Sequence, residues 1–281
     1  MIVLQNENVT VTIAEKGAEL QSITKNGVEY LWHGDPTYWG RRAPLLFPIC
    51  GALKQDTFTY EGTAYTLEKH GYARHQTFEL ECATDTEAVF LLRSDENSLK
   101  QFPFVYEVRV GYRLQGDTVA VSYAVKNPAD KPLYFSIGAH EAYACPEGVG
   151  EYEIEFDKVE TLDTTPDPLH SYDTERVLEN GKVLPLKADY FAVDALIFDR
   201  CVKSEALTLR HKKTGRGVRV GFAGFPYLLL WQKHDAPFLC VEPWCGYPDT
   251  PDHEGDITKK PGIQRVDGGD MFCREHTITL L

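Results

Sequence analysis

Turn signals recur along the chain, and between them run short stretches in which apolar and polar residues alternate. "ITKNGVEYLW" and "DTFTYEGTAYTL" each hold a two-residue turn between two such stretches, and "YEVRVGYRLQGDTVAVSYAVKN" and "LTLRHKKTGRGVRVGF" repeat the pattern. Alternation broken by short turns is typical of β-hairpins, because successive side chains of a strand point to opposite faces. The predicted turns lie at Asn26-Gly27, Glu61-Gly62, Gly116-Asp117 and near Gly215.

Helical periodicity is nearly absent, and only "SDENSLKQF", from Ser94, is typical of a capped helical turn. Many strands with close turns predict antiparallel sheets, and hence an all-β sandwich or barrel. The segment 146–190 is rich in Asp, Thr, Pro and Gly, and we expect long surface loops there with a strand or two. Since no linker-like shift in composition and no internal repeat interrupts the chain, we expect one domain over residues 1–281.

The charge balance limits the classes of partner. The chain has 29 basic and 42 acidic residues, a net charge of -13, whereas nucleic acids and anionic membranes both require a basic face. No apolar run approaches membrane-spanning length, and the N-terminus lacks the features of a signal peptide. Seven cysteines without a tandem framework indicate reduced thiols. We therefore expect a cytoplasmic protein, a monomer or homodimer, that binds neither nucleic acid nor membrane.

One histidine lies on a segment that suits the wall of a cleft. If residues 133–140 of "KPLYFSIGAHEAY" form a strand, then Ser136, Gly138 and His140 share one face. Small residues leave room there, and the imidazole projects into it. The same pattern also fits a half-exposed strand with a surface histidine, and on this stretch alone that interpretation is favoured.

A second histidine lies in "EKHGYARHQTFEL", where we expect His70 and Gly71 on a loop. Gly71 permits a positive φ or a close approach of backbone, and Arg74 offers a rigid fork of donors. His70 and His75 have a spacing that suits no ordinary metal site and no nearby Cys or Asp partner, so we expect no metal, and His75 on the surface. No nucleotide-binding motif is present either, so no cofactor is expected.

The arginines of "YWGRRAPLLFPICG" precede a buried run. We interpret Arg41 as a solvated charge and Arg42, two residues before Pro44, as the better candidate to point inward.

An acid stands where a buried strand would be expected to continue. In "PFLCVEPWCGYPD", residues 238–241 are typical of a strand covered on both faces, and alternation puts Phe238, Cys240 and Glu242 on one face. Proline donates no hydrogen bond, so we expect the strand to end at Pro243. Partial burial would favour the neutral form of the Glu242 carboxyl, as a general base working near neutral pH requires. A Glu held by loop N–H groups or by an arginine fits the pattern equally well.

Four motifs, "RRAPLLFPICG", "HGYAR", "FSIGAHEAY" and "PFLCVEPWCG", occur in the order seen in the aldose 1-epimerase (galactose mutarotase-like) family. The chain resembles the bacterial epimerase-like branch of that family over most of its length. The resemblance implies a large antiparallel β-sandwich and an isomerase that acts on a sugar, the small-molecule partner expected here, without cofactor or metal.

The resemblance also implies roles for individual residues. It makes His140 the general acid, Glu242 the general base and His70 a ligand to the sugar, with Arg42 and Arg74 as the candidate binding arginines. Trp244 or Trp231 is a candidate apolar face for the sugar ring, although for Trp231, after "YLLL", a core position is favoured. The expected substrate is an aldohexose whose ring the acid and base open from opposite sides.

Two positions depart from the family pattern, and three other functions compete. Ala52 stands where many relatives have a basic residue, and Tyr72 replaces the commoner phenylalanine of the "HG-aromatic-AR" motif. Both bear on substrate identity. The alternatives are a hexose-6-phosphate 1-epimerase, in which the arginines hold the phosphate, and a non-catalytic sugar-binding protein or sensor. A glycosidase is less favoured because it usually needs two placed carboxylates.

Overall fold

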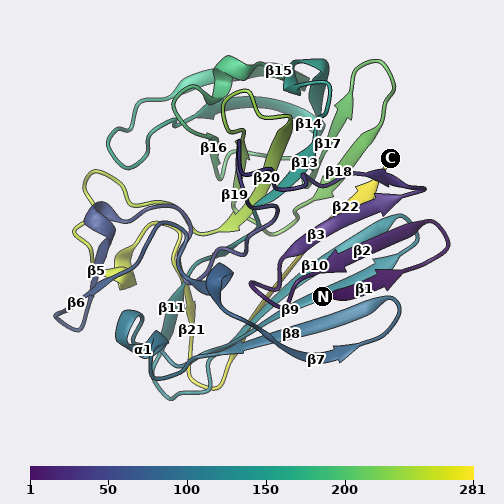
Figure 1. The fold of residues 1–281 in the computed structure, drawn as a ribbon. Helices are drawn as coiled ribbons and strands as arrows, with labels where there is room; N and C mark the ends of the chain where they lie inside the picture. Colours follow the sequence, from purple (N-terminus) through teal and green to yellow (C-terminus); the bar gives the residue numbers. More distant parts are fainter.

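Strands dominate the computed structural model, which describes all 281 residues (Figure 1). They account for 48% of the chain, against 7% for helix, which confirms the predicted all-β class. The strands are β1 (Ile2–Gln5), β2 (Val9–Ile13), β3 (Leu20–Lys25), β4 (Val28–Glu29), β5 (Thr57–Tyr60), β6 (Thr63–Thr66), β7 (Glu79–Ala83), β8 (Glu87–Arg93), β9 (Glu107–Gln115), β10 (Thr118–Lys126), β11 (Leu133–Phe135), β12 (Ile137–Gly138), β13 (Glu141–Ala144), β14 (Tyr152–Thr164), β15 (Glu175–Pro185), β16 (Leu196–Asp199), β17 (Ala206–His211), β18 (Gly217–Gly221), β19 (Tyr227–Trp231), β20 (Phe238–Cys245), β21 (Gln264–Val266) and β22 (Met271–Leu280). The helical segments are α1 (Ser98–Gln101) and five 3-10 turns, at Lys54–Asp56, Ala73–His75, Val149–Glu151, Ala188–Phe191 and Ile257–Lys259.

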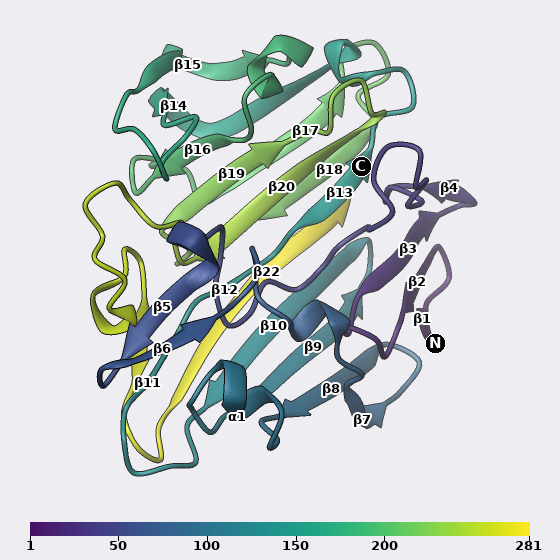
Figure 2. The same ribbon diagram turned by 60° about the vertical axis from the view of Figure 1, so that its left-hand side comes forward.

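The strands form two layers. One layer is an antiparallel sheet of nine strands in the order β15-β14-β17-β18-β22-β10-β9-β8-β7. A five-stranded sheet (β12 and β13 beside β20, then β19 and β16) and a four-stranded sheet (β1-β2-β3-β4) lie against it (Figure 2). One cluster of 63 buried residues takes side chains from all three sheets. This shared core supports the proposal that residues 1–281 form one domain, because separate domains would each have a core of their own.

The predicted hairpins are present. β3 and β4 meet at Asn26-Gly27 and β5 and β6 at Glu61-Gly62, and all four of these turn residues have positive φ. Two-residue hairpin turns of this kind require positive φ, which Asn and Gly adopt most readily. Segment 146–190 contributes the long edge strand β15 and its long neighbour β14, so it contains more strand than loop.

The five-stranded sheet is covered on both faces. On β20, Leu239 and Val241 belong to the core between the layers, whereas Phe238, Cys240 and Trp244 pack in smaller clusters on the other face. All eight residues of β20 are buried. A strand buried on both faces has apolar residues in succession, so the run "FLCV" fits this place.

The prediction that β20 ends at Pro243 is wrong, because the strand continues to Cys245. The carbonyl of Pro243 accepts a hydrogen bond from the backbone N–H of Ala139 at 3.1 Å. In a strand the N–H and C=O of one residue point to the same side, so the donor that proline lacks faces the short gap between β12 and β13. The ladder therefore loses little at this position.

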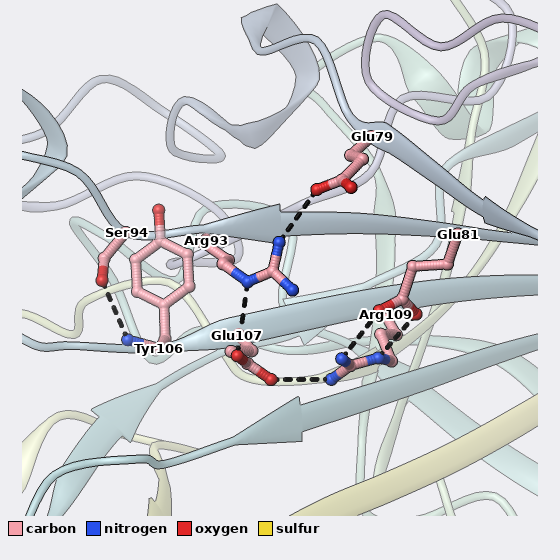
Figure 3. A network of polar contacts seen from close by, with 7 residues as sticks. All are labelled: Glu79, Glu81, Arg93, Ser94, Tyr106, Glu107 and Arg109. Atoms are coloured by element: carbon pink, nitrogen blue, oxygen red, sulfur yellow. Dashed lines mark hydrogen bonds and ion pairs between the residues drawn. The ribbon is translucent and has the colours of Figure 1, made fainter.

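The outer face of the nine-stranded sheet is charged. Figure 3 shows Arg93 between Glu79 and Glu107, with Arg109 joining Glu107 to Glu81. These ion pairs cross β7, β8 and β9 on the side opposite the core. Each exposed pair contributes only about 0–1 kcal/mol. This face is therefore solvated.

All seven cysteines are free; Cys50, Cys145, Cys240 and Cys245 are buried, whereas Cys82, Cys201 and Cys273 are exposed. No helix has the length and apolar character needed to cross a bilayer.

A fully buried ion pair ties the chain after β20 to the segment before β5. The ammonium of Lys260 donates to Asp249 and to the carbonyl of Tyr247, both at 2.8 Å, and neither charged side chain is exposed. Asp249 also accepts from the backbone N–H of Lys54 at 2.9 Å. Burial lowers the pKa of Lys260, and the Asp249 carboxylate opposes that shift.

Asp249→Ala is expected to lower the free energy of unfolding by about 3–5 kcal/mol, because it leaves the Lys260 ammonium buried without a counter-charge. The double variant Asp249→Ala/Lys260→Met removes the stranded charge and should recover part of that loss. Arg93→Ala, which breaks exposed pairs, is the control and should cost about 1 kcal/mol or less. Denaturant titrations followed by tryptophan fluorescence measure all three; equal losses for Asp249→Ala and Arg93→Ala would contradict the assignment.

Candidate active site

A cavity of about 490 Å³ lies over the outer face of the five-stranded sheet. Its floor is formed by side chains of β19 and β20, and loops close its sides. Those loops come from residues 39–52, 69–74, 166–170 and 193–195. The volume falls within the range of roughly 300–1,000 Å³ typical of small-molecule sites.

His140 and Glu242 are direct neighbours across two strands of the floor. Gly138 pairs with Trp244 and Glu141 pairs with Val241, in one unbroken register, which places His140 opposite Glu242. The Nδ1 atom of His140 lies 3.4 Å from Oε1 of Glu242. The two groups therefore share one wall of the cavity, which corrects the expectation that they lie on opposite sides of a ligand.

Burial governs the ionisation of this pair. The His140 and Glu242 side chains are 9% and 2% exposed. Loss of hydration raises the pKa of the Glu242 carboxyl well above its usual value, and Asp194 raises it further. Burial lowers the pKa of His140 to about 3, with a further contribution from Lys69. Both shifts favour the uncharged forms, a carboxyl that can donate a proton beside an imidazole lone pair that can accept one.

His70 is fixed as a hydrogen-bond donor. Its Nδ1 accepts from the backbone N–H of Gly51 at 3.1 Å, and its own backbone N–H donates to the Gly51 carbonyl at 2.9 Å. Because Nδ1 is an acceptor, the proton of the neutral ring resides on Nε2. His70 and Gly71 both have positive φ, and a Cβ on Gly71 would lie 2.4 Å from the Phe47 carbonyl oxygen. Gly71 thus provides both the positive φ and the close approach predicted from the sequence.

Three tryptophans line the cavity beside the histidines. Trp39 stacks on His140 with ring centroids 5.0 Å apart, and Trp231 meets the same imidazole edge-on at 5.6 Å. Trp244 lies edge-on to His70 at 5.6 Å and donates its indole N–H to the Ala139 carbonyl. Trp231 is only partly buried and lines the cavity, so the favoured core position is corrected.

The structure reverses the expected orientations of the two adjacent arginines. Arg42 points away from the cavity, since its guanidinium donates to the carbonyls of His33 and Gln21 and to the Gln21 side chain, each at 2.9 Å. Arg41 lines the cavity instead. It stands on a loop, where strand alternation does not determine direction.

Three cations gather along one side of the cavity: Arg41, Lys69 and Arg74. Arg74 donates to the Lys69 carbonyl at 2.7 Å and lies 3.4 Å from Glu68, so it is held in place. Lys69 forms an ion pair with Asp194 at 3.2 Å. Arg41 is 3.4 Å from Nδ1 of the exposed His75 and has no carboxylate partner.

The two departures from the family pattern have different positions. Ala52 lines the cavity, so the missing basic residue changes the surface that a ligand meets. Tyr72 is buried in the core, where its hydroxyl lies 3.0 Å from the hydroxyl of Tyr106, and it bears on packing instead.

The cavity brings together five of the six predicted site residues: His140, Glu242, His70, Arg74 and Trp244. Sequence reasoning missed Trp39, Lys69 and Asp194, all on loops. "YWGRR" and "EKHG" place two of them next to quoted motifs, whereas nothing in the sequence around Asp194 indicates a place at the cavity.

Comparisons with known proteins identify related sequences and structures. A family model described as aldose 1-epimerase matches residues 1–265. The plasmid-encoded protein LacX of Lactococcus lactis subsp. lactis is 37% identical over 298 aligned positions, covering 100% of this chain and 99% of LacX. The structure of a galactose mutarotase related enzyme from Lactobacillus acidophilus superposes with a TM-score of 0.92 at 30% identity, covering 100% of this chain and 97% of that one. The structure of a galactose mutarotase-like protein from Lactobacillus casei superposes with a TM-score of 0.94 at 29% identity, covering 100% of both chains.

His70 is expected to remain a neutral Nε2–H imidazole across the pH range in which an ordinary histidine, with a pKa of about 6.5, gains its proton. Burial and the neighbouring His140 lower the pKa of His70 well below that value, so the ring stays unprotonated as the pH falls through it. Nitrogen-15 NMR of the imidazole, assigned with His70→Gln, reports both the tautomer and the titration. A ring that titrates near 6.5, or carries its proton on Nδ1, would refute the assignment.

Proposed function

The chain belongs to the aldose 1-epimerase family, and on this premise we propose that it interconverts the α and β anomers of an aldohexose by acid–base ring opening. The single observation that supports this most strongly is the His140–Glu242 pair, an imidazole and a carboxyl 3.4 Å apart on the floor of a cavity sized for one small molecule. The pair supplies one proton donor and one proton acceptor, the minimum that the reaction requires.

The reaction requires two proton transfers, one at each of the two oxygens bonded to C1. Opening a cyclic hemiacetal removes the proton from the O1 hydroxyl and delivers a proton to the ring oxygen O5. The carbonyl at C1 then rotates, and the ring closes from the other face with the two transfers reversed. O1 and O5 are both bonded to C1, so two groups side by side on one wall can serve both oxygens.

Glu242 and His140 would share these transfers. The family resemblance assigns the base to Glu242 and the acid to His140. Burial favours the opposite starting distribution, with the proton on the carboxyl. The two distributions contain the same number of protons, and they interconvert when one proton moves between the carboxyl and the imidazole. The catalytic unit is therefore the pair together with this shared proton. Ring closure reverses the transfers and restores it.

The remaining cavity residues would bind the sugar. His70 offers a fixed Nε2–H donor, which suits a hydroxyl or the ring oxygen. The faces of Trp39, Trp231 and Trp244 suit the apolar C–H surface of a pyranose. Arg74, held by the Lys69 carbonyl, supplies further donors. A sugar-binding protein without catalysis is the competing function; it would need the donors and the aromatic rings but no proton-transfer pair.

A cytoplasmic location and a monomeric or homodimeric state stay predictions from the sequence.

Glu242→Gln and His140→Asn are each expected to lower kcat by roughly 10²–10⁴-fold while sugar binding persists, because each removes one of two proton transfers that every turnover needs. Anomer exchange, followed by NMR with the spontaneous rate subtracted, measures kcat, and calorimetry measures binding. The control is His234→Asn, which alters an exposed histidine outside the cavity and should leave both unchanged. Full activity in Glu242→Gln would make the carboxyl structural and favour the sugar-binding function.

A phosphorylated aldohexose is the second candidate substrate, and the group of Arg41, Lys69 and Arg74 favours it. A hexose 6-phosphate carries its charge at the end of the molecule remote from C1. With C1 against the floor, the phosphate would approach the side of the cavity where Arg41 has no carboxylate partner. Guanidinium groups bind phosphate through strong charge-assisted hydrogen bonds.

If the phosphate binds there, Arg41→Ala should raise KM for a hexose 6-phosphate by roughly 10–100-fold, the equivalent of one hydrogen bond to a charged group, and change KM for the free hexose little. Arg42→Ala is the matched control; it removes contacts to His33 and Gln21 and should lower stability rather than change either KM. Equal effects of Arg41→Ala on both sugars would exclude a phosphate subsite at Arg41 and leave the free hexose as the substrate.

A further inference from the structure

Three possible metal ligands lie together on the outer face of the five-stranded sheet, where His140 and Glu242 line the cavity. An imidazole nitrogen of His140, Sγ of Cys240 and a carboxylate oxygen of Glu242 all lie within 4.8 Å of one another, and all three residues are buried. The sheet produces this arrangement. Alternation along β20 puts Cys240 and Glu242 on the same face, and the register with β13 puts His140 opposite Glu242 and diagonal to Cys240.

The polar atoms of this cluster lack partners. His140 Nδ1 and Glu242 Oε2 are buried and accept or donate no hydrogen bond. An unpaired buried polar atom costs about 1–3 kcal/mol, so its retention needs an explanation. The 3.4 Å between His140 Nδ1 and Glu242 Oε1 is long for a hydrogen bond, but it equals the roughly 3.4 Å that separates nitrogen and oxygen ligands on a tetrahedral zinc ion.

The donor set selects the class of cation. One imidazole nitrogen, one thiolate sulfur and one carboxylate oxygen suit Zn²⁺ and its softer analogue Cd²⁺, whereas Mg²⁺ and Ca²⁺ require oxygen ligands. Three protein ligands leave the fourth tetrahedral position to water, on the side of the cavity that His140 and Glu242 line. When the ion binds, the thiol proton of Cys240 and the carboxyl proton of Glu242 both leave to solvent.

We propose that His140, Cys240 and Glu242 form a binding site for a zinc-like divalent cation, and that the bound ion switches off the proton-transfer pair. The second part rests on the proposed function. A metal on the imidazole lone pair and the carboxylate leaves neither group free to move a proton. The ion is therefore an inhibitor, and the reaction itself proceeds on the metal-free protein. Cys240 takes no part in the chemistry, so it separates metal binding from catalysis.

The binding experiment is a Cd²⁺ titration of metal-free protein in which the three exposed cysteines, Cys82, Cys201 and Cys273, are replaced by serine. The ultraviolet charge-transfer band of a cadmium–thiolate bond should rise to one equivalent and be lost in Cys240→Ser and Cys240→Ala. Cys145→Ser is the matched control, since Cys145 is equally buried but does not belong to the cluster of His140, Cys240 and Glu242, and it should keep the band. A band that survives in folded Cys240→Ser and Cys240→Ala, or that never forms, would overturn the site.

The activity experiment measures anomer exchange with and without Zn²⁺. Zinc should inhibit the parent protein and inhibit Cys240→Ser at least about tenfold less, while the metal-free rates of the two agree. Zinc inhibition that is equal in both, or cadmium binding without inhibition, would refute the regulatory part. If the protein has no epimerase activity at all, the proposed function fails, and the cadmium titration still decides the metal site.

Discussion

The pairing of β13 with β20 is the constraint on which the site depends. A single register, unchanged from Gly138–Trp244 to Glu141–Val241, fixes His140 opposite Glu242. If one strand shifted by one residue, its member of the pair would turn to the opposite face, into the core between the layers. The apolar residues that alternate with them, above all Val241, prevent that shift because they fill the core. The packing of the sandwich therefore positions the proton-transfer pair.

The burial that holds the pair also explains why an acid is tolerated at the end of a hydrophobic strand. An ionised carboxylate with no partner would be very costly at a position 1% exposed. Burial raises the pKa of Glu242 and so favours the neutral carboxyl, and the lowered pKa of His140 favours an uncharged acceptor beside it. In the proposed function, the same loss of hydration makes each group ready to exchange a proton with a sugar. The metal site proposed above uses the same unpaired atoms.

Much of the fold and part of the site follow from the sequence, because alternation and turn chemistry are local. The hairpins, the shared face of Cys240 and Glu242, and the special backbone at Gly71 were all predicted in this way. The orientations of Arg41 and Arg42 were not, since loops have no period from which to infer a side. The prediction that β20 ends at Pro243 was wrong because the N–H that proline lacks would face the gap between β12 and β13. Only the three-dimensional pairing of the strands reveals this gap. Trp39 and Asp194 reach the cavity through long-range packing of loops.

The most direct test of the proposal is a crystal structure of Glu242→Gln with an aldohexose bound. We expect the sugar in the cavity with C1 against the floor, and O1 and O5 within hydrogen-bond reach, about 2.6–3.2 Å, of His140 and the side chain at position 242. A sugar bound outside the cavity, or with C1 turned away from the β13–β20 pair toward Arg41 and Lys69, would contradict it.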